Sequence, residues 1–167
     1  MGTLSYSDGA GSTGISAYDD KMPTAGEEVW DDLDGQANGI ATISNKGTLG
    51  YSGAFAGIGV SISYNPDDAA APATTDGASK SIVLSADVAG ANVFVGVGDK
   101  ATAASNASTD LQTMGATYSN GAVTLGLQAT VIDVTAASSD VDRLGAAISF
   151  AVNENLSISY GISTVDF

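Results

Sequence analysis

The sequence predicts an all-β protein whose strands follow one another as an antiparallel meander. Three observations lead to this fold class. Apolar residues alternate with small polar residues in segment after segment, and a period of two is typical of β-strands. Gly makes up 21 of the 167 residues, and no segment shows the periodicity of a helix. Short turn sequences recur about every 30 to 35 residues, as expected for consecutive hairpins.

Four segments alternate strictly and define the clearest strands. They run from Ile58 to Tyr64, Val123 to Val131, Leu144 to Phe150 and Leu156 to Ile162. One face of each carries mostly Val, Ile, Leu or an aromatic ring, and the other carries mostly Ser, Thr and Gly. Weaker alternation predicts five further strands, at residues 3–7, 48–52, 82–88, 93–97 and 113–118. Val83 and Phe94 interrupt the polar faces of two of these, and the total is about nine strands.

The connections between the predicted strands alternate in length. Short turns are expected at residues 55–57, 89–91, 119–121 and 153–155, and longer polar loops at 65–79, 100–110 and 133–142. Asn120-Gly121 predicts a type I′ turn, in which both central residues have positive φ. We therefore expect one domain over residues 1–167, with hairpin strands from residue 46 onward and one long segment, residues 9–45, before them.

Composition excludes several classes of function. The chain has no Cys and no His, so disulfides, Cys/His metal sites and Cys/His catalysis are excluded. Five basic residues against 19 acidic ones give a net charge of −14, which disfavours nucleic-acid binding. Because no catalytic motif is present either, we expect no enzyme activity. No apolar run reaches the roughly 18 residues of a membrane-spanning helix.

Alternating strands occur in two environments, and side-chain types distinguish them. The polar faces are almost free of Lys and Glu, which normally line the exposed face of a soluble sheet. Several aromatic residues, such as Tyr64, Tyr118 and Phe150, lie near strand ends, as in the aromatic girdles of membrane barrels. The pattern therefore favours an antiparallel transmembrane β-barrel. A secreted, acidic, Gly-rich surface-layer or adhesin β-sandwich, which could bind calcium, stays open as the alternative.

The long segment at residues 9–45 holds a dense group of charges. Seven of the 19 acidic residues lie between residues 18 and 34, together with the only Trp. A solvated surface loop is the simplest interpretation. Inside a pore, the same carboxylates would narrow the lumen and favour cations. The candidate selectivity residues are Asp19, Asp20, Lys21, Glu27, Glu28, Asp31, Asp32 and Asp34.

A calcium site is a third interpretation of the same segment. Asp31, Asp32 and Asp34 are the weak candidates for its ligands. The spacing does not fit an EF-hand, because no Glu stands at the twelfth position of such a loop. We therefore expect no obligatory cofactor, with calcium as an open alternative.

Four stretches of the chain resemble the Gram-negative general diffusion porins, in particular those of alphaproteobacterial type. They are Gly2–Ser7, Leu49–Ser52 continuing to Ile58–Pro66, Val152–Gly161 and, most specifically, Ser16–Asp31, with the sequence SAYDDKMPTAGEEVWD. The resemblance implies a sixteen-stranded barrel in the outer membrane, in contact with lipid and assembled as a homotrimer. It implies passive diffusion of small hydrophilic solutes and ions, and identifies residues 9–45 as the inward-folded constriction loop.

Two departures from this family shape the expectations. The chain is about half the usual length, so it corresponds to part of a barrel, with about nine strands of sixteen. It also lacks the cluster of arginines that many members place on the wall opposite the acidic loop; Arg143 and Lys80 are the local candidates. Two explanations stay open: either those arginines belong to strands that this chain lacks, or the pore prefers cations.

Overall fold

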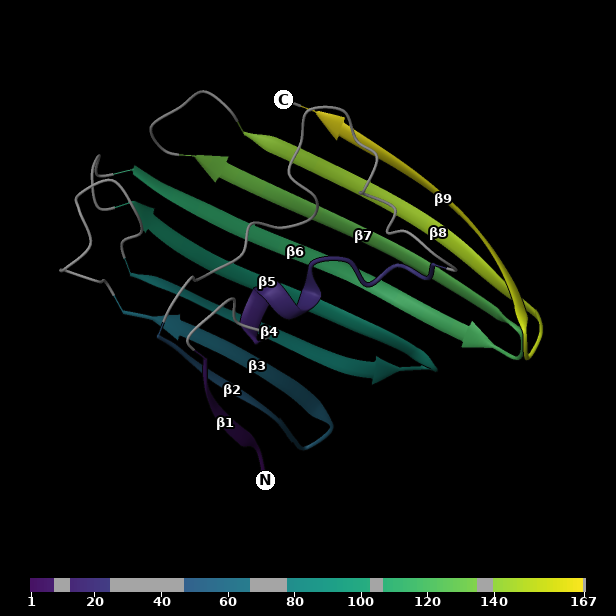
Figure 1. Cartoon of the computed structure of the whole chain (residues 1–167), viewed down its shortest axis with the longest axis horizontal. Coiled ribbons are helices and arrows are strands. Elements are labelled where there is room, and N and C mark those ends of the chain that lie inside the picture. Colours follow the sequence, from purple (N-terminus) through teal and green to yellow (C-terminus); the bar gives the residue numbers. More distant parts are fainter. Residues whose placement is uncertain (8–12, 25–46, 67–77, 103–106, 135–139, 167) are drawn as a thin grey trace.

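The computed structural model describes residues 1–7, 13–24, 47–66, 78–102, 107–134 and 140–166. These residues form a nine-stranded antiparallel sheet in which every strand pairs with the next one along the chain (Figure 1). The predicted all-β meander is therefore confirmed, including its number of strands. In order along the chain, the strands are β1 (Thr3–Ser7), β2 (Thr48–Phe55), β3 (Ile58–Asn65), β4 (Ser79–Val88), β5 (Ala91–Thr102), β6 (Ala107–Asn120), β7 (Val123–Val134), β8 (Val141–Asn153) and β9 (Leu156–Asp166).

Four two-residue turns join strands at one end of the sheet, the right-hand end in Figure 1. Two of them, Ala56-Gly57 and Ala89-Gly90, have positive φ at both residues, as a type I′ turn requires. The predicted type I′ turn at Asn120-Gly121 is wrong. Asn120 pairs with Val123 as the last residue of β6, so the turn is Gly121-Ala122, with positive φ only at Gly121. A Gly at the first central position is the signature of a type II′ turn.

At the opposite end, the strands continue further than side-chain alternation indicates. The predicted loop at residues 100–110 is wrong in its extent, because β5 runs to Thr102 and β6 begins at Ala107. Lys100 pairs with Thr109, and Thr102 pairs with Ala107. Backbone pairing needs no apolar side chain, so a polar strand end leaves no periodic signal in the sequence.

The described residues also contain a 3₁₀ helix, η1 (Gly14–Tyr18), where no helix was expected. That expectation was wrong because a helix of five residues is too short to show a periodic apolar face. Its position across the sheet is visible in Figure 1. Within the described part of the chain, no helix has the length and hydropathy needed to cross a membrane.

The two faces of the sheet differ sharply in chemistry. We call the face that carries η1 the inner face and the opposite one the outer face. The outer face presents large apolar side chains that no other part of the described chain covers: Leu127 is 60% exposed and Leu144 is 57% exposed. The inner face instead buries polar side chains, including Ser63, Thr113 and Gln128. This distribution is the reverse of that in a soluble sheet, whose apolar face is buried.

Candidate functional site: a segment seated on the inner face

Residues 13–24 lie against the inner face of the sheet, and we call them the seated segment. The small side chains on the inner faces of β3 and β4 allow the main chain of η1 to approach the strands closely. A Cβ atom at Gly14, whose φ is +65°, would collide with Ser63 and Ser81. Gly14 therefore serves both as a left-handed residue and as a point of close approach.

Serine hydroxyls on β3 and β4 accept hydrogen bonds from the first main-chain N–H groups of η1. The first N–H groups of a helix have no partner within the helix. Here the Gly14 N–H donates to Ser61 Oγ at 2.8 Å, and the Ile15 N–H donates to Ser81 Oγ at 2.8 Å. Ser81 Oγ in turn shares a 2.6 Å hydrogen bond with Ser63 Oγ. Serines on two neighbouring strands thus accept the hydrogen bonds of the N–H groups that have no partner within η1.

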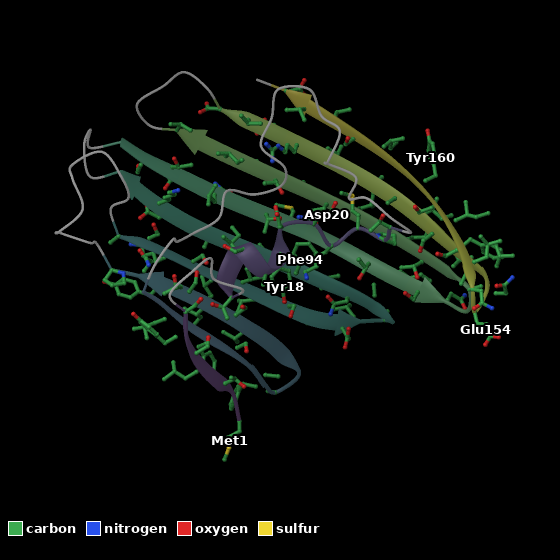
Figure 2. All side chains as sticks on the ribbon, viewed as in Figure 1. Met1, Tyr18, Asp20, Phe94, Glu154 and Tyr160 are labelled. Carbon is green, nitrogen blue, oxygen red and sulfur yellow. The ribbon has the colours of Figure 1, made fainter. Side chains whose placement is uncertain are left out.

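An apolar cluster on the otherwise polar inner face holds the middle of η1. Ile15 is fully buried against Val83 of β4, Phe94 of β5 and Leu111 of β6. The Tyr18 ring lies beside Phe94, with the ring centroids 5.1 Å apart (Figure 2). The interruptions at Val83 and Phe94 in the polar strand faces therefore mark the place where η1 packs.

Gln128 of β7 holds the end of the seated segment. Gln128 is 1% exposed, and it is the one long polar side chain among the residues of β7 that face inward. Gln128 Oε1 accepts from the Lys21 N–H at 2.8 Å. Gln128 Nε2 lies 3.0 Å from the Tyr18 carbonyl oxygen, 2.8 Å from that of Asp19 and 3.2 Å from Thr113 Oγ1. One amide thereby satisfies main-chain donors and acceptors on both sides of Asp20.

Replacing Gln128 by Ala should loosen this end of the segment. Each buried main-chain group left without a partner costs about 1–3 kcal/mol. We expect the Lys21 amide hydrogen to exchange at least about tenfold faster, since tenfold corresponds to 1.4 kcal/mol. Gln112→Ala is the matched control, because Gln112 is exposed on the outer face of β6. Equal exchange rates in the two variants would contradict the role assigned to Gln128.

The structure separates the three predicted selectivity residues that it describes. Asp19 follows η1 directly, and its negative charge attracts Arg143, which is 4% exposed on β8. Asp20 accepts the Met22 N–H at 2.7 Å through Oδ1. Lys21 Nζ lies over the Tyr18 ring, 5.2 Å from its centroid. These interactions lead to different groups: Arg143 for Asp19, the Met22 main chain for Asp20 and the Tyr18 ring for Lys21.

The other predicted residues, Glu27, Glu28, Asp31, Asp32 and Asp34, lie outside the described residues, as does the calcium site considered at three of them. In the part of the chain that the structure describes, no group of three or more Asp, Glu, His or Cys side chains could hold a metal ion.

Sequence reasoning missed the residues that anchor the segment, above all Ile15 and Gln128. A signal was present for both. Val83 and Phe94 broke the polar strand faces, and Gln128 was a long side chain among Ser, Thr and Gly. Arg143, one of the two basic residues considered for the face opposite the acidic segment, does lie on the inner face, where it is attracted by the negative charge of Asp19. Lys80 does not: it pairs with Tyr64 and Asp99 on the outer face.

Comparison with protein-family models and with curated proteins finds no match to this chain.

Proposed function

We propose that this chain forms part of the wall of a water-filled transmembrane β-barrel, an outer-membrane channel for passive diffusion of small hydrophilic solutes and ions. The observation that carries the proposal is the inverted distribution of side chains: large apolar groups are exposed on one face of the sheet, and polar groups are buried under a segment of the chain on the other. Membrane barrels alternate apolar residues toward lipid with polar residues toward the lumen.

The outer face is organised as a band, which supports lipid contact. Across β4 to β7, the row Lys80, Asp99, Asp110 and Asp133 is charged and lies toward the long connections. The rows nearer the short turns are mainly apolar, for example Leu84, Val95, Met114, Ala129 and Leu144. Near the turns, Tyr118 and Tyr160 lie in one row, and Figure 2 shows Tyr160 projecting from β9. A charged rim, an apolar band and an aromatic edge match the outside of a membrane barrel.

The inner face suits a lumen, and the seated segment suits a constriction. Its helix η1 lies over β3, β4 and β5, held by the serines and the Ile15 cluster, and its later residues reach Gln128 of β7. A segment that lies against the inside of a barrel wall reduces the free cross-section. The net charge of −14 supports preference for cations, because a negative field raises their local concentration.

Closure requires partners for the two edge strands. β1 and β9 are the edges of the described sheet. Unpaired strand edges do not persist in hydrocarbon, because their N–H and C=O groups have no water to bind. The resemblance to general porins supplies one solution, a sixteen-stranded barrel assembled as a homotrimer, and we include it in the proposal.

Single-cysteine labelling tests the assignment of the faces directly. The chain has no Cys of its own, so each introduced thiol is a unique attachment point. Leu127→Cys and Leu144→Cys place an environment-sensitive fluorophore on the outer face, and Thr117→Cys and Ser149→Cys place it on the inner face. With the protein in lipid vesicles, we expect lipid-attached nitroxides to quench the outer labels and aqueous iodide to quench the inner ones. A salt gradient across a planar bilayer then measures the cation preference of the closed barrel, in which both edge strands are paired.

Two results would contradict the proposal. One is equal quenching of both pairs by iodide, which would mean that the outer face is not in lipid. The other is protection of the outer labels from aqueous iodide in solution without lipid or detergent, which would mean that a second protein layer covers the apolar face, as in a secreted β-sandwich.

A further inference from the structure

The seated segment covers one side of a pocket that the anchoring contacts do not fill. Its volume is about 640 Å³, within the range typical of small-molecule sites. Strands β1 to β6 contribute its wall on the inner face, and Ala17, Tyr18 and Lys21 border it from the seated segment. Several lining residues, including Gly53, Asn92 and Thr117, lie in the half of the sheet nearer the short turns.

The chemistry of the described lining is unusual for so acidic a chain. Apart from Lys21, its polar groups are neutral: hydroxyls such as those of Ser52 and Thr117, the Tyr18 phenol and the Asn92 amide. Lys21 is the only charged residue among the described lining residues. Hydroxyl and amide groups donate and accept hydrogen bonds, whereas an ammonium group only donates. The lining thus offers many neutral hydrogen-bonding groups and one positive charge.

The contacts of the seated segment explain why the Lys21 side chain borders the pocket. The neighbouring carboxylates are engaged elsewhere, since Asp19 acts on Arg143 of β8 and Asp20 accepts the Met22 N–H. The Lys21 main-chain N–H donates to Gln128 Oε1, and the Lys21 Nζ lies over the Tyr18 ring. Tyr18 is itself fixed, because its ring packs on Phe94 and its hydroxyl donates to Ser85 Oγ at 3.3 Å.

We propose that this pocket binds a small hydroxylated carboxylate of the sugar-acid type. The Lys21 ammonium would bind the carboxylate, and the neutral lining would bind the ligand hydroxyls. The inference goes beyond channel formation and rests on the proposed function in one respect only, that solutes reach the pocket through the lumen. It assigns to the seated segment a role in recognising anions, within a channel whose overall charge favours cations.

Three probes separate the parts of this recognition. Gluconate carries both the carboxylate and the hydroxyls, glucose carries only hydroxyls, and acetate carries only the charge. We expect gluconate to have a lower dissociation constant than glucose or acetate, measured by saturation-transfer NMR on the protein in detergent micelles at constant ionic strength. Comparable dissociation constants for the three probes would overturn the proposal.

Two substitutions at lysine positions then assign the binding to the pocket. Lys21→Met should raise the dissociation constant of gluconate about fivefold, as expected for one partly exposed ion pair, and leave that of glucose unchanged. Lys80→Met removes the same charge on the outer face and should change neither. If Lys80→Met weakens gluconate as much as Lys21→Met does, the effect is one of net charge and the proposal fails.

A variant on the strand side of the pocket, outside the seated segment, guards against simple misfolding. Thr117→Val keeps the shape of the side chain on β6 but removes a lining hydroxyl, and should weaken gluconate and glucose together. No change for either sugar would place the ligand outside this pocket. The binding experiment in micelles does not depend on conductance, so it tests the pocket separately from the channel. If gluconate does not bind while lipid-attached nitroxides still quench the labels on the outer face, the pocket proposal fails and the channel proposal stands.

Discussion

Leu127→Arg should destabilise the protein in a lipid bilayer by about 1–4 kcal/mol, because a charged side chain on the lipid face of a membrane barrel costs about 2–4 kcal/mol at the midplane and about 0–1 kcal/mol near the interfaces. Leu127 is 60% exposed on the outer face of β7. It pairs with Ala116 of β6 and Ala146 of β8, in the apolar band and one row from the row of Tyr118. Equilibrium unfolding by urea in lipid vesicles measures the free energy of unfolding of the variant and of the parent.

Ser149→Arg is the matched control for this prediction. Ser149 lies on the neighbouring strand β8 and pairs with Thr124 and Ser159 on the inner face. In a lumen, an added arginine is solvated and alters ion selectivity more than stability. A stable Leu127→Arg together with a strongly destabilised Ser149→Arg would reverse the assignment of the two faces.

Ile15→Asp should detach η1 from the wall. Truncating a buried Ile to Ala already costs about 2–5 kcal/mol, and an unpaired carboxylate in the same apolar cluster costs more. The penalty falls on the contact between η1 and strands β4 to β6, because Ile15 packs on Val83, Phe94 and Leu111. Since the seated segment narrows the lumen in the proposed channel, we expect a larger single-channel conductance in a planar bilayer.

Ala17→Asp separates the loss of the apolar contact from the added charge. Ala17 lies in the same 3₁₀ helix but borders the pocket instead of packing into the Ile15 cluster. It should change ion selectivity with little change in conductance. An unchanged conductance in Ile15→Asp would mean that the segment does not limit the open cross-section of the pore.

Local rules were sufficient for most of the sheet. Strand direction and pairing follow from alternation with a period of two and from short turns, and both are properties of neighbouring residues. For the same reason, the two faces of strands such as Val123–Val134 follow from the order of their residues alone. Local rules failed where backbone pairing continues without apolar residues, as at Thr102 and Ala107, and where one residue shifts a turn, as at Gly121-Ala122.

By itself, the sequence determined the nine-stranded meander and the different chemistry of its two faces, because side chains two residues apart share a face whatever lies around them. Only the tertiary structure decided what the inner face holds. Ile15 reaches Ser81, 66 residues later, and Lys21 reaches Gln128, 107 residues later. Such partners leave no periodic trace in the chain, because they come together only after the strands have paired. The same distant contacts place Lys21 at the border of the pocket.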